Sequence, residues 1–119
     1  MTDEAVALPD PRFETFPRHA ELGELLRSYA AARPGLFELR ELGRSHEGRE
    51  IWLVVATNTA TGSDRDKPAF WVDGNIHAAE LTGCTAVLYW LHVLATGYGS
   101  DPRITTLLDT RCVYLCPRL

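Results

Sequence analysis

Residues 68–80 read PAFWVDGNIHAAE, and this stretch decides the fold class because it joins a strand to a helix. The run 68–73 has the length and the bulky apolar residues of a buried β-strand, and Gly74-Asn75 ends it. From Glu80 to Gly97, apolar residues recur at steps of three and four, which predicts a long amphipathic helix. A strand that leads directly into a long helix is typical of α/β proteins.

Elements on both sides of this stretch extend the α/β pattern. The turn-forming run from Gly43 to Gly48 separates two strands of a hairpin, and Asp101 followed by Pro102 is typical of a helix start. The expected elements are helices at 19–32, 80–97 and 102–108, and strands at 36–42, 51–56, 68–73 and 111–116. The sequence therefore predicts a mixed β-sheet with helices packed on it.

The chain divides into two parts. Residues 1–18 contain Pro9, Pro11 and Pro17 and show no apolar period, so we expect an irregular lead-in. Residues 19–119 contain all the expected elements and stop directly after a strand that belongs inside a sheet. We therefore expect residues 19–119 to be the N-terminal portion of a larger domain.

Composition excludes several classes of partner. The formal net charge is −4, which disfavours nucleic acid and anionic lipid as partners. No apolar run approaches the roughly 20 residues of a membrane-spanning helix, and the acidic N-terminus is unlike a signal peptide, so we expect a cytoplasmic protein.

We interpret the cysteines (Cys84, Cys112, Cys116) and the tryptophans (Trp52, Trp71, Trp90) as core residues.

His77 and Glu80 form the candidate metal site. They are three residues apart where a strand gives way to a helix, so an imidazole and a carboxylate can project toward one point. Zinc accepts both ligand types. The spacing alone leaves an ordinary reading open, in which Glu80 favours the helix N-terminus and His77 lies in a loop. His92 follows Glu80 on the same helix at a rise of about 18 Å, too far to share an ion.

Four stretches in register resemble the zinc carboxypeptidases, or metallocarboxypeptidases. Residues 74–80 resemble the family's first zinc-ligand motif, His-x-x-Glu after a strand, and residues 43–51 resemble its first hairpin. Residues 98–109 resemble the loop and short helix that follow, and residues 113–117 resemble the next strand. Together they cover roughly residues 20–119, and the sequence is identified as a member of this family.

The resemblance implies zinc as cofactor, His77 and Glu80 as its first two ligands, and peptides with a free C-terminus as substrates. In the family, the third histidine ligand, the glutamate that activates water and the arginines that hold the substrate carboxylate come later. We therefore expect no catalytic residue within this chain, which is inactive alone. Two ligands out of four predict weak zinc binding, roughly micromolar or poorer. Ala79 replaces an arginine of the digestive members and leaves the side-chain preference open.

Two alternative functions stay open from the sequence. One is a related zinc deacylase that cleaves N-acyl amino acids, although the hairpin and the Asp101-Pro102 segment favour a peptidase. The other is a non-catalytic interaction module in which an exposed sheet edge pairs with another chain or with itself.

Overall fold

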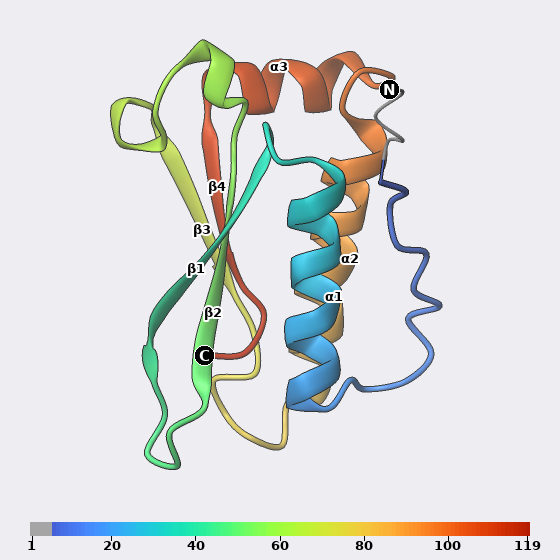
Figure 1. Cartoon of the computed structure of the whole chain (residues 1–119), viewed down its shortest axis with the longest axis vertical. Coiled ribbons are helices and arrows are strands. Elements are labelled where there is room, and N and C mark those ends of the chain that lie inside the picture. The colour runs from blue at the N-terminus through green and yellow to red at the C-terminus, as the bar shows by residue number, and fades with distance from the viewer. Residues whose placement is uncertain (1–5) are drawn as a thin grey trace.

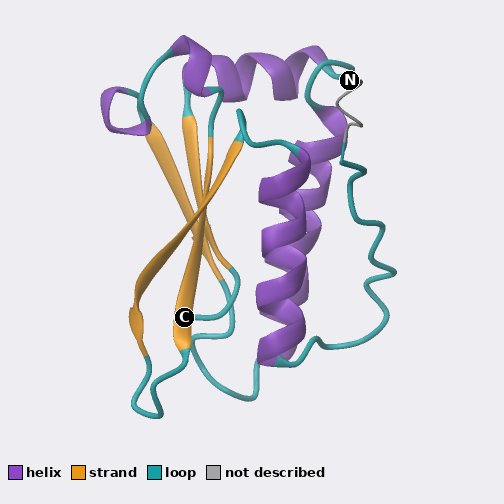
Figure 2. Ribbon diagram, in the orientation of Figure 1, coloured by secondary structure: helices purple, strands orange, loops and turns teal. Residues whose placement is uncertain are grey.

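A four-stranded sheet in the order β1-β2-β4-β3 carries two helices along one face and a third helix across one end (Figures 1 and 2). The structure is a computed structural model, and it describes residues 6–119. The elements are α1 (His19–Ala32), β1 (Phe37–Arg44), β2 (Glu50–Ala56), the 3-10 turns η1 (Thr59–Thr61) and η2 (Asp64–Asp66), β3 (Ala69–Asp73), α2 (Leu81–Gly97), α3 (Pro102–Thr110) and β4 (Cys112–Cys116). The expected mixed sheet with packed helices is confirmed.

The strand pairing decides which chain segments meet. β1 and β2 form an antiparallel hairpin, β2 pairs antiparallel with β4, and β3 runs parallel to β4. In the parallel pair Asp73 lies opposite Cys116, so the carboxyl ends of β3 and β4 lie side by side at one end of the sheet. The segment after β3 and the last residues of the chain therefore lie together.

The first hairpin differs from the prediction at its turn. A register shift between Glu41 and Gly43 lets the ladder continue to Arg44 opposite Glu50, beyond the expected strand end at residue 42. The turn therefore covers residues 45–49 instead of the predicted 43–48, because the bulge keeps β1 paired as far as Arg44.

The core lies between the sheet and the helices α1 and α2. Alternation along β2 turns Val54 and Ala56 toward the helices, where they meet a buried set that comprises Leu22, Leu26, Tyr29, Leu36, Phe37, Cys84, Val87, Leu88, Leu91, Leu94, Ala95, Leu108, Val113 and Leu115. Tyr29 Oη and His92 Nδ1 are 2.7 Å apart and join α1 to α2. All three cysteines are buried and free, as expected, and burial raises the pKa of the Cys116 thiol to about 11.

β3 is an exposed edge strand, and the prediction of a buried strand is wrong. Phe70 is 57% and Trp71 45% exposed, and Trp90 on α2 is 43% exposed, so two of the three tryptophans lie outside the core. The reason is topological, since β4 is the single neighbour of β3 within residues 6–119. Phe70 and Trp90 stack on each other, with ring centroids 5.9 Å apart.

The lead-in packs along the outer side of the helices. Residues 6–18 contain no helix or strand, and they run beside α1 and α2 (Figure 1). Phe13 makes edge-to-face contacts with Tyr89 and His92, at centroid distances of 5.4 and 5.6 Å. Across residues 6–119, no helix has both the length and the apolar character that a membrane crossing requires.

A close backbone contact fixes the start of α2 against the end of β3. A Cβ atom on Gly74 would overlap the backbone of Gly83, and a Cβ atom on Gly83 would lie 3.1 Å from the backbone nitrogen of Asn75. Glycine is therefore required at position 74 for the helix to approach the strand end this closely, and a side chain at position 83 would have to displace the Asn75 backbone by a few tenths of an ångström.

A buried carboxylate ties the η2 turn to the sheet. Asp64 accepts hydrogen bonds from Arg40 Nη2 at 3.0 Å and from Tyr114 Oη at 2.6 Å. Both bonds favour the ionised carboxylate, and they hold the pKa of Asp64 below its ordinary value. This contact joins η2 to β1 and β4.

We expect Gly74→Ala to lower the free energy of unfolding by about 1–3 kcal/mol, because the new methyl group forces the helix away from the strand. Urea denaturation of the purified chain measures this change. Gly35→Ala is the matched control, since a Cβ atom at Gly35 has nothing within 4 Å. Equal stability of the Gly74 and Gly35 variants would contradict the tight contact.

We expect Asp64→Asn to lower the free energy of unfolding at pH 7 by about 1–2 kcal/mol, because Arg40 and Tyr114 lose a charged acceptor. The folded-state pKa of Asp64 is lowered, so its stabilising effect is present above the unfolded pKa of about 4 and disappears as the pH falls through the folded value. The difference between wild type and variant should therefore shrink in acid. Urea denaturation at pH 7 and at about pH 3 tests this, with the exposed Asp66→Asn as control.

Candidate metal centre

His77 and Glu80 lie in the loop between β3 and α2, at the end of the sheet where β3 and β4 both finish. The imidazole Nδ1 of His77 is 2.7 Å from Glu80 Oε1, so the two side chains meet, as their spacing predicts. The His77 side chain is 79% and the Glu80 side chain 60% exposed, which leaves both accessible to an ion from solvent. Glu80 is the N-cap residue of α2, so the helix begins one residue later than expected.

The loop turns through a short set of backbone hydrogen bonds. The Glu80 amide donates to the His77 carbonyl at 2.9 Å, and the Gly83 amide donates to the Glu80 carbonyl at 3.2 Å. The first bond closes a turn that brings the side chains of residues 77 and 80 to the same side. The convergence of the His77 and Glu80 side chains is thus a property of the backbone turn before the helix.

Asn75 is a site residue that the sequence analysis missed. It is 8% exposed, has a positive φ of 59° and donates from Nδ2 to the carbonyls of His77 at 3.1 Å and Ala78 at 3.3 Å. Asparagine tolerates the left-handed region better than most residues, so the Gly74-Asn75 pair is the one sequence signal for this conformation.

Arg118 is the second residue that the sequence did not single out. Its Nε donates to Asn75 Oδ1 at 2.9 Å, and its Nη2 donates to the Pro17 carbonyl at 3.0 Å and contacts Cys84 Sγ at 3.6 Å. Asn75, Ala78 and Arg118 line a cavity of about 330 Å³ beside the loop. The sequence gives no sign of the contact between Arg118 and Pro17, because the two residues are 101 positions apart along the chain.

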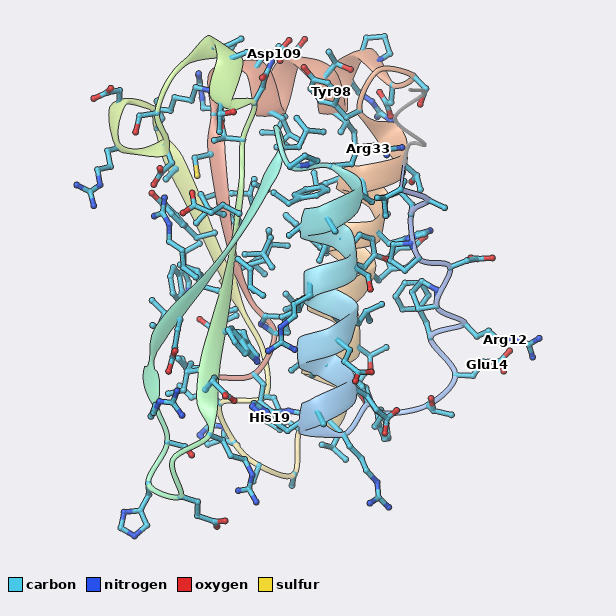
Figure 3. The ribbon with its side chains drawn as sticks, in the orientation of Figure 1. Arg12, Glu14, His19, Arg33, Tyr98 and Asp109 are labelled. Carbon is cyan, nitrogen blue, oxygen red and sulfur yellow. The ribbon has the colours of Figure 1, made fainter. Side chains whose placement is uncertain are left out.

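The other histidines do not join the site. His19 Nε2 is 3.5 Å from Glu50 Oε2, His92 contacts Tyr29, and His46 lies in the hairpin turn. Figure 3 places His19 at the opposite end of the molecule from Tyr98 and Asp109, near the first hairpin. Among the residues that the structure describes, no group of three or more His, Cys, Asp or Glu side chains is arranged to hold a metal ion.

The donor set fits part of a zinc site. A neutral imidazole nitrogen and a carboxylate oxygen are both zinc ligands, and they lie close enough here to bind one ion. Catalytic zinc sites with three protein ligands use one more side chain than this pair supplies. The geometry supports a partial zinc site and nothing more complete.

Comparison with known proteins identifies the family. The sequence model of the zinc carboxypeptidase family matches residues 22–119. The chain is 35% identical over 105 residues to carboxypeptidase A2 of Rattus norvegicus, which covers 88% of this chain and 24% of that protein. It is also 33% identical to carboxypeptidase D of Homo sapiens in an alignment 129 positions long. That alignment covers 91% of this chain and 9% of that protein.

The solved structures agree in fold. Carboxypeptidase A from Helicoverpa armigera superposes with a TM-score of 0.79 at 22% identity, over 98% of this chain and 27% of that chain. A metallo-carboxypeptidase from Burkholderia cenocepacia gives a TM-score of 0.62 at 26% identity, over 80% of this chain and 26% of that chain. The chain thus spans about a quarter or less of the length of these relatives. On its sequence and its fold, the chain belongs to the zinc carboxypeptidase family of peptide hydrolases.

Proposed function

We propose that residues 19–119 are part of a zinc-dependent carboxypeptidase domain and that His77 and Glu80 are two of its zinc ligands. The observation that carries this proposal is the 2.7 Å approach of His77 Nδ1 to Glu80 Oε1 at the carboxyl edge of the sheet. Family membership over residues 22–119 supports it independently. The activity we propose is hydrolysis of peptide bonds next to a free C-terminus.

The two ligands have distinct tasks in this proposal. His77 provides a neutral nitrogen, and Nδ1 is the atom that faces Glu80. Glu80 provides negative charge that offsets the charge of the ion. Zinc in such a site lowers the pKa of water and polarises a carbonyl group.

Arg118 is not a free partner for a substrate carboxylate in this structure. Its Nε and Nη2 atoms already donate to Asn75 and Pro17. We therefore assign neither substrate binding nor general-base catalysis to the residues described here. We propose that the third ligand, the general base and the substrate-binding arginines lie outside residues 1–119, so this chain alone is inactive.

We expect the chain to bind Zn²⁺ with a dissociation constant of roughly micromolar or weaker, because two ligands give a fraction of the affinity of a full set. Isothermal titration with ZnCl₂ measures the constant, and His77→Ala and Glu80→Ala should each abolish the binding. His46→Ala is the control, since His46 is exposed in the hairpin turn.

Hydrolysis of a blocked C-terminal dipeptide, followed in the same samples, should be absent. Zinc binding that survives in both the His77 and Glu80 variants would contradict the assigned ligands. Turnover by the wild-type chain would contradict the proposal that residues outside it complete the site.

A specific observation also favours an interaction role for the sheet edge. The two edge strands differ in charge, because β1 carries Glu38, Arg40, Glu41 and Arg44 whereas β3 carries a charge only at Asp73. Charged side chains protect an edge strand from pairing with another chain, and exposed aromatic residues do not. We propose that β3 pairs with β3 of a second copy when this chain is alone.

Antiparallel pairing centred on Trp71 explains the choice of a second copy. It brings Asp73 of each copy toward the start of β3 in the other, where Arg111 is exposed beside the neighbouring strand β4. The same arrangement covers Phe70 and Trp90, which line a cavity of about 370 Å³ together with Arg111. Opposite charges and apolar surface thus match across the two-fold axis.

We expect sedimentation velocity to show a dimer that forms as the protein concentration rises from about 10 to about 500 μM. This range covers the dissociation constants of weak association. Trp71→Lys should keep the chain monomeric, because it places a charge in the centre of the edge. Leu42→Lys on the opposite edge strand is the matched control and should dimerise like wild type. Dimerisation of the Trp71 variant, or a wild-type chain that stays monomeric, would contradict the proposed pairing.

A further inference from the structure

Asn75 holds the backbone of the ligand loop. Its Nδ2 donates to the carbonyls of both His77 and Ala78. The His77 carbonyl is therefore held from two sides, by Asn75 Nδ2 and by the Glu80 amide. His77 and Glu80 bond to each other, and within residues 6–119 Asn75 is the one other residue whose side chain donates a hydrogen bond to residues 76–80.

The exposure of the two ligands makes this backbone contact important. The side chains of His77 and Glu80 contact each other but are mostly in solvent, at 79% and 60% exposed. A protein site normally orients its ligands through packing or hydrogen bonds to the ligand side chains. Here the position of the ligands depends on the backbone turn, and Asn75 is the side chain that stabilises the turn.

Arg118 determines which way the Asn75 amide points. A guanidinium group has donors and no acceptor, so the group that faces Arg118 Nε at 2.9 Å has to be the amide oxygen. The NH₂ end of Asn75 is then left to face the two loop carbonyls. Arg118 itself is fixed by the Pro17 carbonyl and by contact with the Cys84 sulfur.

We propose that Asn75 is a positioning residue for the zinc ligands and that Arg118 sets the orientation of its side chain. This inference rests on the proposed function, since it concerns how His77 and Glu80 are presented to the metal. Without the Asn75 amide, the loop samples turns in which the two ligand side chains do not converge. Zinc affinity then falls, although neither ligand has changed.

The test compares variants that keep the left-handed backbone with variants that change the amide. Asn75→Gly accepts the positive φ but removes both side-chain bonds, and Asn75→Asp keeps an acceptor for Arg118 but has no donor for the loop. We expect both variants to bind Zn²⁺ at least about tenfold more weakly than wild type in titrations with ZnCl₂. Arg118→Lys retains a donor and should lose less affinity than Arg118→Met.

A metal-free measurement accompanies the titration. Backbone ¹⁵N relaxation and amide exchange in zinc-free protein should show greater mobility at residues 76–80 and faster exchange of the Glu80 amide in Asn75→Gly. Asn58→Ala is the matched control, because Asn58 also donates two bonds, to Tyr98 and Asp109. These partners lie at the far end of the molecule (Figure 3), so this variant should lose stability and keep its zinc affinity.

The outcomes separate the inference from the proposed function. If wild type binds zinc, His77→Ala does not, and Asn75→Gly matches wild type in affinity and loop mobility, the positioning role is overturned and the metal site stands. If wild type and His77→Ala bind zinc equally, the metal site itself is wrong. In that case an unchanged loop in zinc-free Asn75→Gly would also overturn the role of Asn75 in ordering it. Equal affinity losses in Asn58→Ala and Asn75→Gly would show a general effect of stability and overturn the inference.

Discussion

The approach of Gly83 to Gly74 is the constraint on which the rest of the structure depends. It places the first turn of α2 directly against the end of β3, with no side chain between the two backbones. The loop between them is therefore short of space and turns sharply through Asn75 at a positive φ. The same contact starts α2 on a course that buries Cys84, Leu88 and Leu91 against the sheet. One pair of glycines thus links the core to the end of the sheet where His77 and Glu80 lie.

Much of the fold followed from the order of apolar and turn-forming residues. Helix α1 was predicted with its observed bounds, His19–Ala32, since the spacing of apolar residues along a helix is a local property of the sequence. The burial of β3 was predicted wrongly, because a run such as Phe70-Trp71-Val72 indicates a strand but not how many neighbours it has. The bulge in β1 was also missed, since it depends on pairing with β2.

The candidate site, like the fold, was predictable only in the part that depends on local sequence. His77 and Glu80 were recognisable because ligand spacing is a local property of the chain, and the structure brings them together. Their use as zinc ligands stays a prediction. Asn75 and Arg118 were not recognisable, because their contact spans 43 positions and depends on the parallel pairing of β3 with β4. Sequence periodicity describes single elements, whereas this contact is a consequence of topology.

The Arg118 contacts also affect the order in which the protein folds. Arg118 donates to Asn75, 43 positions earlier, and to the carbonyl of Pro17 in the lead-in, 101 positions earlier, so its bonds close residues 17–118 into one loop. Contacts of such long range cost chain entropy before they return any energy, and they form late. The helices and the hairpin have local contacts, so we expect them to form first. We expect the loop between residues 76 and 80 to reach its final shape only after Arg118 has met Pro17.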